Sequence, residues 1–84
     1  MEIKVLGTGC TKCKKLLAEA EEAVRRSGQP VTVVKVEELR DIMACGVRQT
    51  PALVIDGKVR ASGRIASAQE IACWLAEAAE ERGR

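Results

Sequence analysis

Hydrophobic and polar positions alternate over residues 1–6, and this pattern predicts a β-strand. The segment Gly7-Thr8-Gly9 interrupts the pattern and predicts a tight loop. From residue 11 to residue 27 the hydrophobic positions recur at helical spacing, which predicts a helix with one hydrophobic side. That side carries Cys13, Leu16, Leu17, Ala20, Ala23 and Val24, and the opposite side carries Lys14, Lys15, Glu21, Glu22 and Arg25.

The next segments add a strand and a short helix. Gly28 and Pro30 end the first predicted helix. A β-branched run at residues 31–36 predicts a second strand, which a right-handed helical crossover places parallel to the first. Residues 37–45 predict a second helix that stops at Gly46. Its hydrophobic positions are Leu39, Ile42 and Met43.

A hairpin and a last helix complete the chain. Residues 51–55 and 58–61 predict two strands, joined by an Asp56-Gly57 pair that favours a type I′ turn. Ser67 and Glu70 have the spacing of a capping box and predict the start of the last helix, whose hydrophobic positions are Ile71, Trp74, Leu75 and Ala78. The predicted order is therefore β-α-β-α-β-β-α. This order indicates an α/β fold with one four-stranded mixed sheet flanked by three helices.

The length of 84 residues predicts a single domain over residues 1–84. Only one residue, Trp74, is aromatic, so the core has to be built from Ala, Leu, Ile and Val. The formal net charge of +2 arises from mixed acidic and basic residues, and we therefore expect neither nucleic-acid nor membrane binding. The sequence shows no signal peptide or segment of membrane-spanning length, which favours a cytoplasmic protein. We also expect the protein to be a monomer.

Four cysteines in a reducing compartment indicate catalysis or metal binding. Cys10 and Cys13 lie one helical turn apart, close enough to form a disulfide. The hydrophobic side of the helix includes Cys13, whereas Cys10 precedes the first full turn and is expected to be exposed. The helix start and nearby cations should lower the pKa of Cys10, so we expect Cys10 to attack a substrate disulfide and Cys13 to resolve the mixed disulfide. These cations are Lys12, Lys14 and Lys15.

Two segments carry a family resemblance: residues 7–13, GTGCTKC, and residues 46–59, GVRQTPALVIDGKV. In them the chain resembles the thioredoxin-like superfamily, and more narrowly its small bacterial and archaeal thioredoxin/glutaredoxin-like redox-active disulfide proteins. The resemblance implies a minimal thioredoxin-like fold and a thiol-disulfide oxidoreductase that needs no cofactor beyond its own redox-active disulfide. It also implies that Pro51 is cis and packs across the sulfurs, while the Thr50 backbone pairs with an extended substrate segment.

The same resemblance implies protein disulfides as substrates and makes thioredoxin reductase a candidate electron donor. Thr11 and Lys12, between the two cysteines, are expected to shape the site. Relatives that use glutathione carry a Gly-Gly and acidic pair after the hairpin. This chain has Ser62-Gly63-Arg64 there, so the resemblance does not identify glutathione as the reductant.

Metal binding is the alternative interpretation of the cysteine pair, because soft-metal carriers of the ferredoxin-like class also place C-x-x-C before their first helix and can hold Cu(I) or Zn(II). Such carriers usually have Met where this chain has Thr8, and two strands after the first helix. A zinc site that adds Cys45 and Cys73 lacks the paired spacing of zinc knuckles. We expect Cys45 to cap a helix and Cys73 to be exposed. A non-catalytic interaction domain is a third possibility.

Overall fold

The computed structural model of the chain describes residues 1–8 and 11–82. The elements follow the predicted order, which is thereby confirmed. They are β1 (Glu2–Leu6), α1 (Thr11–Ser27), β2 (Thr32–Val36), α2 (Leu39–Ala44), β3 (Ala52–Ile55), β4 (Lys58–Ser62) and α3 (Ala68–Arg82).

The four strands form one mixed sheet in the order β2-β1-β3-β4. Strands β1 and β2 are parallel, with Ile3 opposite Val33, and α1 makes the crossover between them. Strands β1 and β3 are antiparallel, as are β3 and β4. The two central strands are therefore β1 and β3, and all four residues of β3 are buried.

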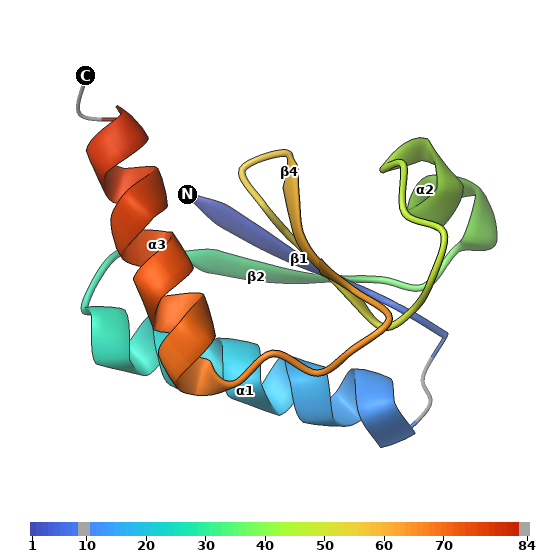
Figure 1. Ribbon diagram of the computed structural model, residues 1–84, viewed down its shortest axis with the longest axis horizontal. Coiled ribbons are helices and arrows are strands. Elements are labelled where there is room, and N and C mark those ends of the chain that lie inside the picture. The colour runs from blue at the N-terminus through green and yellow to red at the C-terminus, as the bar shows by residue number, and fades with distance from the viewer. Residues whose placement is uncertain (9–10, 83–84) are drawn as a thin grey trace.

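The two faces of the sheet support hydrophobic clusters of different size. On one face, Ile3 and Val5 of β1 pack with α1 and α3, in a cluster that includes Leu16, Leu53 and Ile71. On the other face, a smaller cluster forms beneath α2 from Leu6, Ile42, Val47, Ala52 and Val54. Figure 1 shows α1 and α3 lying together on one side and α2 apart from both. The large cluster thus anchors the helix that follows the first loop.

Helix α2 is shorter than predicted and contributes one buried side chain. It begins at Leu39 rather than at residue 37, because Glu38 has an extended backbone (φ −71°, ψ 126°) at the N-cap position. Ile42 is 3% exposed, whereas Leu39 and Met43 are each 66% exposed. Two of the three hydrophobic positions that predicted this helix therefore do not face the sheet.

The hairpin between β3 and β4 has the predicted turn chemistry. Asp56 and Gly57 both have positive φ values, +47° and +84°, as a type I′ turn requires. The turn is also attached to β1, because the Glu2 N–H donates to Asp56 Oδ1 at 3.0 Å and the Asp56 N–H donates to the Glu2 carbonyl at 2.9 Å.

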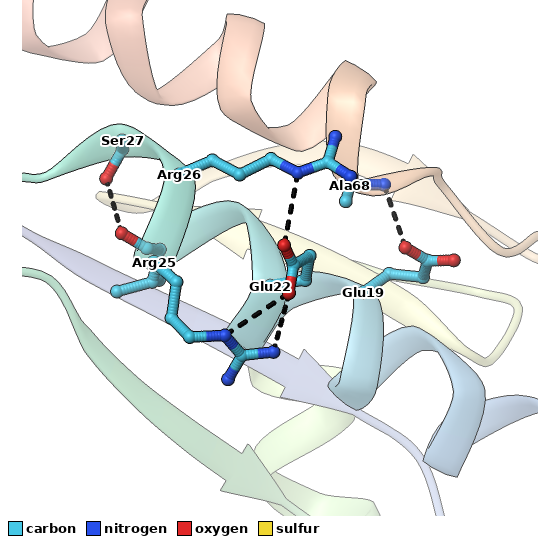
Figure 2. A network of polar contacts seen from close by, with 7 residues as sticks. Glu19, Glu22, Arg25, Arg26, Ser27 and Ala68 are labelled. Atoms are coloured by element: carbon cyan, nitrogen blue, oxygen red, sulfur yellow. Dashed lines mark hydrogen bonds and ion pairs between the residues drawn. The ribbon is translucent and has the colours of Figure 1, made fainter.

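Helix α3 is capped as predicted and is linked to α1. The Glu70 N–H donates to Ser67 Oγ at 3.2 Å, and the Ser67 N–H donates to Glu70 Oε1 at 3.3 Å, which is the reciprocal pattern of a capping box. The Ala68 N–H donates to Glu19 Oε2 of α1 at 3.0 Å, a contact drawn in Figure 2. One α1 carboxylate thus satisfies a free N–H group at the start of α3.

Candidate active site

Cys13 is the third residue of α1 and lies on its buried side, 7% exposed. It shares this side with Leu16 and Ala20, both fully buried, as the helical spacing predicts. Cys10, the other member of the predicted pair, lies outside the described residues together with Gly9. The exposure and the role of Cys10 therefore stay predictions.

Gly7, which follows β1, provides the space that the Cys13 sulfur occupies. A Cβ atom on Gly7 would overlap Cys13 Sγ, and it would lie 3.1 Å from Cys13 Cβ and 3.9 Å from Pro51 Cα. The Gly7 N–H also donates to the Val36 carbonyl at 3.0 Å, which holds this residue at the end of β1. Gly7 is buried and lies outside the left-handed region, so the position needs glycine for space. The sequence pattern identified only a loop glycine, because nothing in it indicates which side chain fills that space.

Pro51 also lies close to Gly7, with its Cα 3.9 Å from the Gly7 Cβ position. Its peptide bond with Thr50 is cis, and its side chain is fully buried. The loop is attached to the end of β4, because the Gly63 N–H donates to the Pro51 carbonyl at 2.9 Å and Ser62 Oγ donates to the Gln49 carbonyl at 3.2 Å. Thr50 is exposed, and its backbone forms no hydrogen bond with any residue in the described ranges.

Cations gather where α1 begins. Thr11 and Lys12 are exposed, and the first turn of α1 contains no acidic residue. Two more lysines, one on α1 and one on β2, help to line a cavity of about 20 Å³ beside the Cys13 side chain. The cavity is lined by Val5, Gly7, Cys13, Lys14, Leu17 and Lys35. A helix start surrounded by cations favours the thiolate form of a nearby cysteine.

Comparison with known proteins agrees with this geometry. The family model described as a thioredoxin domain matches residues 1–76. The chain belongs to the thioredoxin domain family. A thioredoxin from Methanothermobacter thermautotrophicus is 38% identical to this thioredoxin-family chain over 71 residues, which cover 84% of this chain and 92% of the relative. A thioredoxin from Methanocaldococcus jannaschii is 35% identical over 69 residues, covering 82% of this chain and 79% of that protein.

The predicted superfamily and fold are thus confirmed for this thioredoxin-family protein. Family membership supports an activity of the thiol-disulfide oxidoreductase class. In the part of the chain that the structure describes, no helix is long and apolar enough to cross a membrane.

The two remaining cysteines of the thioredoxin-family chain lie on different elements, at the end of α2 and on α3. Cys45 is the C-cap residue of α2, where its N–H donates to the carbonyls of Asp41 and Ile42, each at 3.2 Å. Cys73 is exposed on α3, which covers the opposite face of the sheet. Both predictions are confirmed. Within residues 1–8 and 11–82, no three Cys, Asp or Glu side chains lie close enough together to hold a metal ion.

Gly63 is a further residue of the site that the sequence did not identify. Its φ of +76° is in the left-handed region, and a Cβ atom there would overlap Gln49 Oε1. The Gln49 side chain therefore packs directly on the Gly63 backbone, two residues before the cis proline. The glycine allows β4 to approach the loop that carries Thr50 and Pro51.

Proposed function

We propose that this thioredoxin-family chain reduces protein disulfides with a Cys10–Cys13 dithiol. The observation that carries the proposal is the position of Cys13, which is buried on the first turn of α1 against Gly7, whose Cβ position also lies 3.9 Å from Pro51 Cα. A buried thiol one helical turn after another cysteine is suited to resolving a mixed disulfide, because it is shielded from direct attack by external substrates.

In the first step of the proposed reaction, the Cys10 thiolate attacks one sulfur of the substrate disulfide. The substrate S–S bond breaks, a Cys10–substrate disulfide forms, and the other substrate sulfur leaves as a thiolate that takes a proton from water. Cys10 immediately precedes Thr11, the first residue of α1. The unpaired N–H groups of the helix start and the charge of Lys12 favour the attacking thiolate.

In the second step, Cys13 loses its proton and attacks the sulfur of Cys10. The Cys10–Cys13 disulfide forms, the mixed disulfide breaks, and the second substrate sulfur leaves as a thiolate. Two electrons have then passed from the protein dithiol to the substrate. The protein needs a dithiol electron donor to return to its reduced form, and we propose a thioredoxin reductase for this role rather than glutathione.

Substrate binding is assigned to the loop at Thr50. The Thr50 backbone N–H and carbonyl have no partner in the described part of the chain, while neighbouring groups are bonded to the end of β4. An extended substrate segment can pair with these two groups as an added strand. Pro51 Cα, next to Thr50, lies 3.9 Å from the Gly7 Cβ position that the Cys13 sulfur occupies, and this supports substrate binding beside Cys13.

The proposal is tested by an insulin reduction assay with dithiothreitol as reductant, comparing the wild type with Cys10→Ser and Cys13→Ser. We expect Cys10→Ser to reduce the rate to the uncatalysed level. When the pre-reduced Cys13→Ser variant is mixed with insulin after the dithiothreitol has been removed, we expect a mixed disulfide that persists, because no internal thiol resolves it. Non-reducing electrophoresis and intact mass measure this species.

Cys73→Ser is the matched control, because Cys73 is an exposed thiol on α3. It should reduce insulin at the wild-type rate. Equal activity of the wild type and Cys10→Ser would contradict the proposal, and so would a mixed disulfide that accumulates on Cys13 in the wild type.

A further inference from the structure

The charged residues of α1 are segregated along the helix. Three lysines, all exposed, fall within the first five residues of the helix, and no acidic residue accompanies them. We refer to Lys12, Lys14 and Lys15 as the lysine cluster. The acidic residues of α1 begin only at Glu19. The cluster therefore lies at the end of the helix that carries Cys13.

No member of the lysine cluster forms an ion pair with a residue that the structure describes. Most basic side chains elsewhere in the fold do form ion pairs. These are Lys4, Arg25, Arg26, Lys35, Lys58, Arg60 and Arg64. Arg40 and Arg48 are also exposed and form no ion pair within the described ranges, but each has no basic neighbour in the sequence, whereas the lysine cluster places three unpaired cations within four residues.

The nearest candidate partner on α1 is engaged elsewhere. Glu19 lies four residues after Lys15, a spacing at which ion pairs form on a helix. Its carboxylate instead accepts the N–H of Ala68 at 3.0 Å. Figure 2 shows that Glu22 accepts from Arg25 and Arg26 towards the far end of α1. Glu21, which lies between Glu19 and Glu22 in the sequence, is exposed and forms no ion pair with a residue that the structure describes. None of the three acidic residues of α1 therefore pairs with the lysine cluster.

The position of the cluster is unfavourable for the helix itself. The N-terminus of a helix carries a partial positive charge, so cations in the first turn are repelled by it and by one another. Ion pairs within the described fold do not offset this repulsion. A partner that brings negative charge to this end of α1 would relieve it.

We propose that the lysine cluster is a docking surface for a protein partner whose disulfide is flanked by acidic residues. The proposal rests on the proposed dithiol function, because it places the partner's disulfide beside the cysteine pair. Opposite charges of this kind mainly raise the association rate, and their effect falls as salt screens them. The lysine cluster thus selects among disulfide substrates by their charge.

The test uses two peptides with the same disulfide loop, flanked on both sides by glutamates in one and by lysines in the other. Second-order rates of reduction by the reduced protein are measured at ionic strengths of about 20 mM and about 300 mM. For the wild type we expect the acidic peptide to react roughly tenfold faster than the basic one at low salt, and this ratio to approach one at high salt.

The variant K12Q/K14Q/K15Q should lose this preference. The matched control R25Q/R26Q/K58Q also removes three positive charges, but at ion-paired positions remote from the cluster, and it should keep the preference. Using the ratio of two peptides cancels any change in the reactivity of Cys10 itself, because both peptides meet the same thiolate.

Uncharged 2-hydroxyethyl disulfide separates the docking proposal from the function on which it rests. If the wild type does not reduce this reagent, the proposed dithiol function is wrong and the docking proposal falls with it. If it does reduce the reagent but the lysine-cluster variant keeps the wild-type peptide ratio, only the docking proposal is overturned.

Discussion

Gly7 cannot carry a side chain because the sulfur of Cys13 occupies the place where its Cβ atom would lie. The two residues come from the end of β1 and the start of α1, with the first loop between them. Since Gly7 is also held by its bond to Val36, the sulfur is positioned against a fixed piece of backbone. The end of the strand therefore determines where the predicted resolving thiol lies.

Gly7→Ala should destabilise the protein by about 1–3 kcal/mol, because the added methyl group overpacks a buried contact. The cost should fall by more than about 1 kcal/mol when Gly7→Ala is made in a Cys13→Ala background, where the sulfur is absent. Urea unfolding of the wild type, the two single variants and the double variant measures the coupling free energy between Gly7 and Cys13.

Gly57→Ala is the control for this double-mutant cycle of Gly7 and Cys13. Gly57 has a φ of +84° and open space around its Cβ position, so the substitution strains the backbone without touching Cys13. It should cost about 1–2 kcal/mol in both backgrounds. If Gly7→Ala costs the same free energy of unfolding in the wild type and in the Cys13→Ala background, Gly7 does not make room for the Cys13 sulfur.

The described cysteines should differ in their rate of alkylation. In a Cys10→Ser variant, we expect iodoacetamide to label Cys73 first, Cys45 second and Cys13 last, because the three thiols are exposed, half-buried and buried. Peptide mass mapping over time measures the order. In a denaturant the differences should disappear, and faster labelling of Cys13 than of Cys73 in the native protein would contradict the burial of Cys13.

Helix α2 should depend on one side chain for its attachment. Ile42→Ala removes the buried anchor of the small cluster and should cost about 2–4 kcal/mol. Leu39→Ala, on the exposed side of the same helix, should change the free energy of unfolding by less than about 0.5 kcal/mol. Urea unfolding of the two variants measures these free energies. Equal costs would mean that Leu39 is also packed.

The capping box should make α3 sensitive to acid. The Arg64 guanidinium, which donates to Glu70, and the Ser67 N–H hold the pKa of the Glu70 carboxyl below its usual value. A lowered folded-state pKa stabilises the fold above about pH 4.3, and the contribution is lost as the pH falls through the lower folded-state pKa. The melting temperatures of the wild type and Glu70→Gln should therefore converge as the pH is lowered from 7 towards about 3.

Ser67→Ala tests the second hydrogen bond of the capping box, from the Glu70 N–H to Ser67 Oγ. Loss of the hydroxyl that accepts the Glu70 N–H should cost about 1 kcal/mol at neutral pH. Glu80→Gln serves as the control for the acid titration, because Glu80 is exposed on α3 and forms no ion pair with a residue in the described ranges. A pH-dependent difference as large for Glu80→Gln as for Glu70→Gln would rule out the capping box as its cause.

The order of the elements could be predicted because it depends on local signals. The periodicity of α1, the Asp56-Gly57 turn and the Ser67 and Glu70 caps each act over a few residues, and the structure confirms all three. Helix α2 was predicted less well, because Leu39 and Met43 follow helical spacing without facing the core. Spacing shows which residues share a helix face but not how much sheet there is for that face to cover.

The sequence by itself determined the cysteine spacing, the fold class and the side of α1 on which Cys13 lies, because these follow from period and chain order. Only the tertiary structure decided that Gly7 accommodates the Cys13 sulfur, that Gly63 accommodates Gln49, and that Glu19 caps α3 rather than pairing with Lys15. Each of these contacts joins residues from different elements. Their partners are determined by how strands and helices pack in space, which no local pattern of residues encodes.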